Sequence, residues 1–230
     1  MNAPLSAALA VFSHLPPAER FHIHARAFSA PLEAVAARVP AGGTVADVGC
    51  GHGLLTALLA LSDTRRQVHG VDPDPRKIEW AQLGPGRLSN VRTEVGTVES
   101  LAERLPGQFD AVVVCDVLYL LPVERWSGFL REARRLLRPG GRLLLKEAEG
   151  DRSWKHLKCL AQEVVMVKLL GRTKAGGALV LQPRDAMEAM LRQAGFTPRE
   201  TVELGAGYTT PHILYVAEAT AGAVGADSAA

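Results

Sequence analysis

The sequence predicts an α/β fold with a doubly wound, mostly parallel sheet that is covered by helices on both faces. Two observations support this prediction. Short apolar runs rich in β-branched residues alternate with helical patterns between residues 45 and 146. The first run, 45–48, ends in alternating glycines (Gly49, Gly51, Gly53) and leads directly into an apolar helical pattern. Ligands of such sheets bind at the carboxyl edge of the strands, so we look for functional residues there.

The composition is that of a single globular chain. A length of 230 residues is enough for one domain with a sizeable core. The 26 basic and 24 acidic side chains leave a net charge of +2, which gives no reason to expect a nucleic-acid partner. No apolar run reaches the roughly 18 residues of a spanning helix, and no signal-peptide pattern opens the chain. Cys50, Cys115 and Cys159 contain no C-x-x-C pair, so we expect reduced thiols in a cytoplasmic protein and no metal site.

The N-terminal part shows one helical pattern. Residues 1–20 carry little periodicity, and we expect a loose lead-in followed by one domain over residues 21–219. Apolar residues recur at helical spacing from Phe28 to Val39, with Ser29 as the expected N-cap. Three polar residues precede this helix, and no further ligand nearby completes a metal site, which favours solvated or ligand-covering side chains: His22, His24 and Arg26.

The middle of the chain alternates strands and helices. Right-handed crossovers place the ends of parallel strands on one edge, which brings Gly49, Asp72, Thr97 and Cys115 together. The expected strands are 45–48, 67–71, 91–95, 109–115 and 142–146, and the expected helices are 54–61, 75–82, 99–104 and 123–137.

The alternation stops after Lys146. The pattern predicts one long helix over 154–169, a glycine-rich loop over 171–177, a helix over 184–194 and strands over 197–204 and 213–217. Residues 220–230 are expected to form a disordered tail. Segment 151–174 has six basic and two acidic residues, hence a charge of +4, so it either caps a substrate pocket within 151–182 or contacts an anionic membrane surface.

The residues after the first two strands have the chemistry of a nucleoside site. Glycines let the backbone approach a ligand closely, and the amides of the following helical turn point toward it. Asp72 ends the neighbouring strand 19 residues after Gly53, where a carboxylate accepts both hydroxyl protons of a ribose. The spacing G-x-G-x-G differs from the G-x-G-x-x-G of dinucleotide dehydrogenases, and no G-x-x-x-x-G-K-[ST] phosphate loop occurs.

Four motifs in order resemble those of class I S-adenosylmethionine-dependent methyltransferases over roughly residues 40–150. They are 47–53 (DVGCGHG), 70–72 (GVD), 109–114 (FDAVVV) and 137–143 (LRPGGRL). The resemblance implies a Rossmann-like sheet of seven strands whose last strand is antiparallel. It also implies S-adenosyl-L-methionine as cofactor and in-line transfer of a methyl group to an O, N or C atom of a small organic or lipid-like acceptor.

The resemblance also implies a set of cofactor contacts. Asp47 supports the ammonium end, Asp72 takes the ribose hydroxyls next to Pro73, and Cys115 offers its carbonyl beside Asp116. The family often has an acidic residue for the adenine amine after the third strand, and this chain has Gly96, Thr97 and Val98 there instead. The residues that approach the methionine and ribose are Gly49, Cys50, Gly51 and Gly53.

The acceptor side is less defined. Methylases of base amino groups generally show [DNS]-P-P-[YFW] after the fourth strand, whereas this chain has Cys-Asp-Val-Leu-Tyr, which disfavours a nucleic-acid substrate. Histidine is the natural base for a hydroxyl acceptor because its pKa lies near neutrality. The catalytic candidates are His212, Tyr208 and Tyr119, and the other acceptor-side candidates are Lys146, Glu147 and His156.

Two alternatives stay open from the sequence alone. One is a cofactor-binding or regulatory protein of the same fold without turnover. The other is a nicotinamide-dependent oxidoreductase, which the missing third-position glycine and the lack of a Tyr-x-x-x-Lys pair disfavour.

Overall fold

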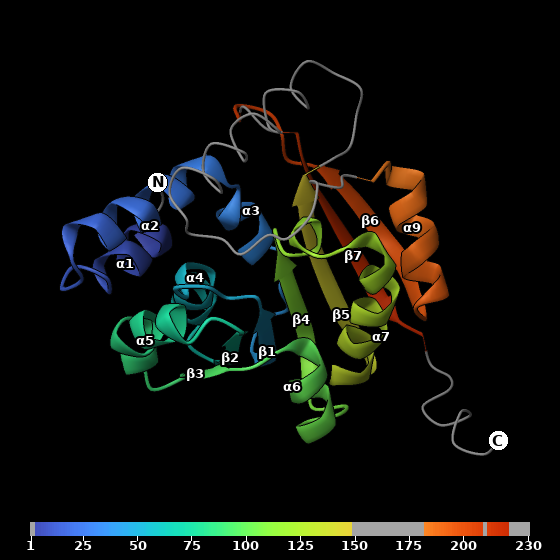
Figure 1. The fold of residues 1–230 in the computed structure, drawn as a ribbon, viewed down its shortest axis with the longest axis horizontal. Helices are drawn as coiled ribbons and strands as arrows, with labels where there is room; N and C mark the ends of the chain where they lie inside the picture. The colour runs from blue at the N-terminus through green and yellow to red at the C-terminus, as the bar shows by residue number, and fades with distance from the viewer. Residues whose placement is uncertain (1–2, 149–181, 209–210, 221–230) are drawn as a thin grey trace.

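The chain folds around a seven-stranded mixed sheet, as predicted. A computed structural model describes residues 3–148, 182–208 and 211–220. The strand order is β3-β2-β1-β4-β5-β7-β6, in which β7 runs antiparallel to both neighbours and the other pairs are parallel (Figure 1). The strands are β1 (Gly43–Val48), β2 (Arg66–Asp72), β3 (Val91–Val95), β4 (Phe109–Cys115), β5 (Leu137–Ala148), β6 (Phe196–Glu203) and β7 (His212–Ala219).

Helices cover both faces of the sheet. On one face, α1 (Ala3–Ala10), α2 (Pro17–Ser29), α3 (Leu32–Ala36) and α4 (Leu54–Ser62) contribute to one buried cluster. On the other, α6 (Val98–Arg104), α7 (Trp126–Leu136) and α9 (Arg184–Gln193) contribute to a second cluster (Figure 1). The remaining short elements are α5 (Pro75–Leu83), η1 (Pro85–Arg87), η2 (Leu118–Leu120) and η3 (Val123–Arg125).

Side chains alternate between the two faces of the sheet along each strand, so neighbouring residues of one strand belong to different buried clusters. Leu144 lies in the α4-side cluster and Leu145 in the α7-side cluster. Because successive side chains of a strand point to opposite faces, Lys146 follows Leu144 and Glu147 follows Leu145. Lys146 and Glu147, adjacent residues near the end of β5, therefore point to opposite faces of the sheet.

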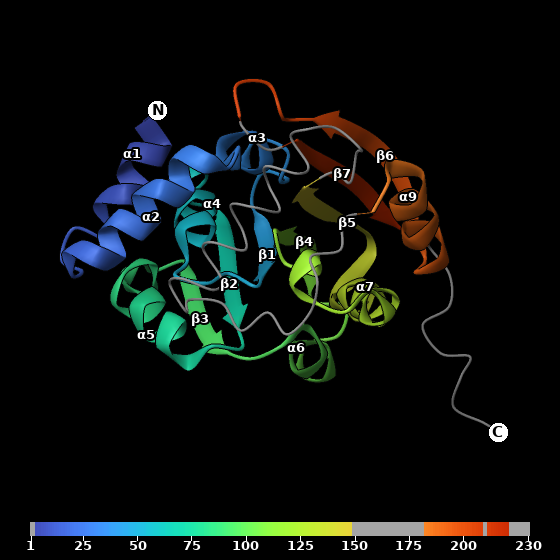
Figure 2. The same cartoon turned by 45° about the horizontal axis from the view of Figure 1, so that its top comes forward.

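The N-terminal segment is more ordered than the sequence predicted. Instead of a loose lead-in over residues 1–20, α1 places Leu5 and Leu9 in the core and contacts α4, and α2 begins at Pro17 (Figure 2). Alanine-rich helices can be stabilised by tertiary packing without a strong apolar period, and this is why the pattern was missed.

The predicted helix over 28–39 is also wrong in its bounds. Ser29 is the last residue of α2 and not the N-cap of the next helix, which spans only α3. Phe28 is 65% exposed, so the apolar residue that set the start of the predicted period does not face the core. Elsewhere the differences are small, except that β5 begins at Leu137, which pairs with Phe109 of β4 before the register shifts and Arg142 pairs with Ala111.

The predictions for residues 149–181 and 221–230 lie outside the described residues. These are the capping helix with its basic segment, His156 and most of the C-terminal tail. No helix of the described residues is long and apolar enough to cross a membrane.

Candidate active site

The glycine turn after β1 is held by backbone hydrogen bonds to β2. The amides of Gly49 and Cys50 both donate to the carbonyl of Val71, at 2.8 and 3.0 Å. Gly49, Gly51 and Gly53 all have positive φ, at 77°, 57° and 83°. A Cβ atom on Gly49 would lie 2.4 Å from Val117 Cγ2, whereas one on Gly51 would meet nothing within 4 Å. Gly49 is thus required by packing inside the protein, and Gly51 borders open space.

Asp72 is tied to this turn. Its Oδ2 accepts the Gly51 amide at 2.9 Å, and its Oδ1 accepts the Asp74 amide at 2.9 Å. Asp72 is buried, Pro73 beside it is exposed, and Asp74 caps α5. A carboxylate fixed by two amides next to an open glycine turn presents its remaining lone pairs in a set direction, as recognition of a ribose diol requires.

Asp47 lies beneath the same turn. Its carboxylate accepts the Thr56 hydroxyl of α4 at 2.6 Å, and its side chain is almost fully buried. Burial raises the pKa of Asp47 to about 6, although the Thr56 hydrogen bond opposes the shift. Burial likewise raises the pKa of the neighbouring Cys50 thiol, so Cys50 carries no charge here.

The residues after β3 have different surroundings from those expected. Thr97 caps α6, because its hydroxyl accepts the Ser100 amide at 3.3 Å while the Ser100 hydroxyl accepts the Thr97 amide at 3.0 Å. Val98 is 2% exposed and lies in the α7-side cluster with Leu101. The hydroxyl of Thr97 and the side chain of Val98 are therefore both engaged within the protein.

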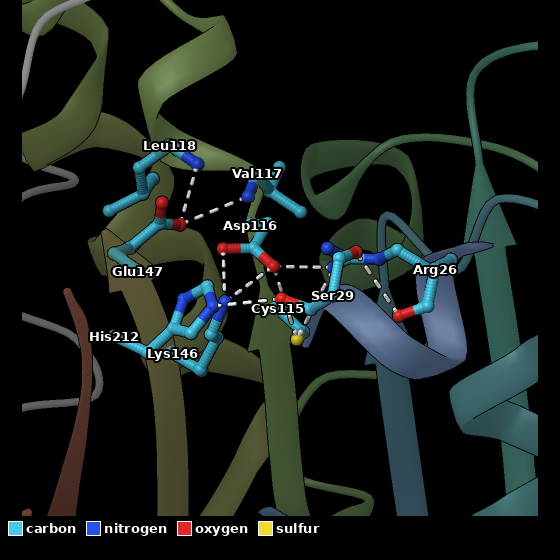
Figure 3. A network of polar contacts seen from close by, with 9 residues as sticks. All are labelled: Arg26, Ser29, Cys115, Asp116, Val117, Leu118, Lys146, Glu147 and His212. Carbon is cyan, nitrogen blue, oxygen red and sulfur yellow. Dashed lines mark hydrogen bonds and ion pairs between the residues drawn. The ribbon is translucent and has the colours of Figure 1, made fainter. Parts of the chain in front are cut away.

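The end of β4 begins a second, charged part of the same edge. Asp116 has a φ of 60°, the one non-glycine residue with positive φ among those described, and its amide donates to the Lys146 carbonyl at 2.8 Å. Its carboxylate accepts Lys146 Nζ at 2.6 and 2.7 Å and Arg26 Nη2 at 2.5 Å (Figure 3). Burial alone would raise the pKa of Asp116, but the two cations hold it well below its usual range. One carboxylate is shared by two cations.

Helix α2 bridges the two parts of the edge. Near its start, Glu19 Oε2 lies 2.9 Å from Nε2 of His52 in the glycine turn, and the ring of His22 packs 5.1 Å from that of His52. Near its end, Arg26 reaches Asp116. Glu19 and Arg26 are seven residues apart and lie on one helix face, so one face of α2 contacts both parts.

His212 joins the charged part from β7. The antiparallel register pairs it with Ala148, which places it at the edge, and its Nε2 lies 3.0 Å from the Ser29 carbonyl of α2 (Figure 3). A carbonyl only accepts, so Nε2 carries the proton. Burial, with Lys146 nearby, lowers the pKa of His212 to about 4, and the imidazole is neutral at pH 7. Its buried Nδ1 has no hydrogen-bond partner among the described residues.

Comparisons with known proteins identify the family. Residues 45–141 match the family described as methyltransferase domain. A ubiquinone biosynthesis O-methyltransferase of Pseudomonas fluorescens (strain Pf0-1) is 30% identical over 179 residues, which are 77% of this chain and 75% of that protein. The chain belongs to the class I S-adenosylmethionine-dependent methyltransferases. A relative of the same name from Xanthomonas oryzae pv. oryzae (strain PXO99A) is 39% identical to the methyltransferase over 117 residues, 50% of this chain and 47% of that one.

Solved structures share the fold of the methyltransferase. The 1,6-didemethyltoxoflavin-N1-methyltransferase of Burkholderia thailandensis superposes with a TM-score of 0.68 at 20% identity, over 96% of this chain and 92% of that one. The geranyl diphosphate C-methyltransferase of Streptomyces coelicolor A3(2) gives 0.65 at 16% identity, over 92% and 88%. Both were solved with S-adenosylhomocysteine, and S-adenosyl-L-methionine is the cofactor of the family.

The structure brings most of the predicted site residues of the methyltransferase to one edge, in two groups. Asp47, Gly51 and Asp72 gather over β1 and β2, while Cys115, Asp116 and His212 gather over β4, β5 and β7. Tyr119 in η2 is half-buried and interacts electrostatically with Arg26. Tyr208 packs edge-on against His212 at 5.3 Å and lines a surface groove with Pro31, Ala34 and Leu204.

Sequence reasoning missed how α2 is used. Arg26 was grouped with His22 and His24, and its partner Asp116 lies 90 residues away. The Glu19–His52 contact was also missed. The spacing of Glu19, Ile23 and Arg26 on one helix face was the available signal, with a buried residue between two charged ones. The described residues contain no cluster of three or more metal-binding side chains.

Proposed function

We propose that this methyltransferase transfers a methyl group to a hydroxyl oxygen of a small organic acceptor that binds over β4, β5 and β7. The observation that carries the proposal is the pair of cations, Arg26 and Lys146, on the single carboxylate of Asp116. This cluster adjoins the glycine turn, so an acceptor over it stands next to the cofactor position.

The residues over β1 and β2 fit S-adenosyl-L-methionine. Gly51 leaves open space where a side chain would stand, and Asp72 is held by two amides at the end of the neighbouring strand. Asp47 is a buried acid suited to the cofactor's ammonium group. When bound, the cofactor supplies a methyl group on a positively charged sulfur, and the departing thioether is neutral and needs no acid.

The charged cluster favours an oxygen acceptor for an electrostatic reason. A hydroxyl becomes a better nucleophile as it loses its proton, and nearby cations favour the oxyanion. Within the described residues, the guanidinium of Arg26 donates only through Nη2, to Cys115 and Asp116, which leaves Nε and Nη1 for an acceptor oxygen. A protonated amine would be repelled by the same cations, which disfavours an amino acceptor.

The predicted base, His212, suits a different role. A group with a pKa of about 4 is a weak base for a phenol, whose own pKa resembles the value near 10 of tyrosine. The buried, unprotonated Nδ1 is a hydrogen-bond acceptor and can orient an acceptor hydroxyl instead. In this proposal the cations lower the pKa of the hydroxyl, His212 orients it, and the hydroxyl proton is released to water as the methyl group is transferred.

The names of the relatives support the oxygen assignment. The ubiquinone biosynthesis O-methyltransferases match about three quarters of their own length, and the name specifies an oxygen acceptor. The structural neighbours include proteins named as N- and C-methyltransferases, so the fold by itself does not choose the atom.

The test is methyl transfer from labelled S-adenosyl-L-methionine to catechol and 3,4-dihydroxybenzoate, with benzylamine as the amine control. We expect O-methylated products, and at least a tenfold loss of kcat/KM in Arg26→Met and Lys146→Met. Arg38→Met is the matched control, because Arg38 also pairs with a carboxylate, that of Glu200, but on the protein surface. N-methylation of the amine with no product from either catechol would contradict the proposal.

A further inference from the structure

Glu147 is a buried acid that the proposed transfer does not use. It is 3% exposed at the end of β5, and it points to the face opposite to Lys146. Its Oε1 accepts two backbone amides, Val117 at 3.0 Å and Leu118 at 2.9 Å (Figure 3). Val117 lies between β4 and η2, and Leu118 is the first residue of η2.

Among the described residues, Glu147 is the acceptor of both turn amides. Asp116, with its positive φ, turns the chain so that the next two amides point away from the β4–β5 ladder. Leu118 is fully buried, and a buried amide without an acceptor is costly. Glu147 is the acceptor for both amides.

The same turn touches the cofactor loop. Val117 Cγ2 occupies the space that a Cβ on Gly49 would need, at 2.4 Å, so the Val117 side chain packs directly on the backbone of Gly49. Gly49 is fixed from its other side by its hydrogen bond to Val71. A displacement of Val117 would therefore remove the packing contact on Gly49 and leave the glycine turn to its hydrogen bonds with Val71 and Asp72.

We propose that Glu147 is a positioning residue for cofactor binding: its Oε1 holds the Val117–Leu118 turn, and this turn holds Gly49 in place. This inference rests on the cofactor site and is independent of the acceptor assignment.

The charge state of the neighbourhood agrees with a neutral Glu147. Burial, followed by the negative charge of Asp116, raises the pKa of Glu147 to about 8. Asp116 has two cations, whereas Oε2 of Glu147 has no hydrogen-bond partner among the described residues. Asp116 is thus the ionised member of the pair, and the acid at Glu147 retains its proton at pH 7.

Neutrality makes glutamine a close mimic. Glu147→Gln keeps an acceptor oxygen for both amides and replaces the acid hydroxyl by an amide NH₂ of similar size. Glu147→Ala removes the acceptor. Leu191→Ala is the matched control for general destabilisation. Leu191 is fully buried in the α7-side cluster, as Leu118 is, but it lies in α9.

The experiment measures the affinity for S-adenosylhomocysteine by calorimetry and the amide hydrogen exchange of Val117 and Leu118 without ligand. We expect Glu147→Ala to weaken the affinity at least tenfold and to speed exchange of both amides at least tenfold. Glu147→Gln should stay within threefold of the parent in both readouts, and Leu191→Ala should keep the parent affinity.

Three results would overturn the proposal. Parent-like affinity in Glu147→Ala would show that the turn does not support Gly49. A loss in Glu147→Gln as large as in Glu147→Ala would show that a negative charge is needed. An equal loss in Leu191→Ala would show a general effect of stability. None of these measurements involves an acceptor, so they stand apart from the assignment of the methylated atom.

Discussion

The two halves of the carboxyl edge of the sheet differ in the chemical groups that form them. Over β1 and β2 the proposed cofactor-binding groups are a glycine turn and one carboxylate, Asp72, fixed by backbone amides. Over β4, β5 and β7 they are charged side chains from distant segments, Arg26, Asp116 and Lys146. The first half is local and tolerates little change in backbone, and the second depends on the packing of α2 against the sheet.

The largest expected effect is that of Asp72→Ala on the cofactor half. Loss of two charge-assisted hydrogen bonds to the ribose, each worth about 1.5–3 kcal/mol, corresponds to at least about a hundredfold in affinity for S-adenosylhomocysteine. Calorimetry measures this loss of affinity for S-adenosylhomocysteine. Asp74→Ala is the control, since Asp74 caps α5 and its loss should cost about 1 kcal/mol of stability without changing the affinity. Unchanged affinity in Asp72→Ala would show that the cofactor does not bind over β1 and β2 as proposed.

The second expected effect separates two glycines of the same turn. Gly49→Ala combines a positive φ with a clash against Val117, and we expect it to lose about 2–4 kcal/mol of unfolding free energy. Gly51→Ala has only the positive φ and should lose about 1 kcal/mol, yet it places a methyl group in the open space. Urea denaturation should therefore find Gly49→Ala the less stable variant, and calorimetry should find weaker binding of S-adenosylhomocysteine in both. An equal loss of stability in the two variants would contradict the different roles.

The smallest expected effect concerns His212 and pH on the acceptor half. The folded pKa, about 4, lies below the unfolded value near 6.5, so the folded state binds fewer protons between these values. Stability is therefore lost as pH falls from about 6.5 to 4, by on the order of 2 kcal/mol from this group. His212→Gln should flatten that part of the stability profile in denaturant melts at pH 7, 5.5 and 4.5. An unchanged slope would mean that His212 is not held neutral.

The cofactor half was predictable from sequence because its chemistry is local. The spacing of Gly49, Gly51 and Gly53 predicts the turn. The right-handed crossover rule then places Asp72 beside this turn, and no side-chain contact has to be known for that prediction. The parallel part of the sheet followed from the alternation of strands and helices, whereas the antiparallel last strand followed from the family resemblance.

The acceptor half was only partly predictable. Lys146, Glu147 and His212 were recognised as candidates, but their division between the two faces depends on the exact register of β5, whose start the sequence placed at Arg142. Arg26 lies 90 residues from Asp116, and no local pattern encodes that pairing. Thr97 has a local role that the sequence analysis did not name, because its hydroxyl caps α6.

The central claim is that the cofactor and the acceptor occupy separate halves of one edge. A crystal structure with S-adenosylhomocysteine tests it most directly. We predict the ribose hydroxyls within hydrogen-bond distance of Asp72, with the space beside Arg26 and Lys146 left open for an acceptor. A nucleoside bound over β4 and β5, with Asp72 still contacting only the amides of Gly51 and Asp74, would contradict the claim.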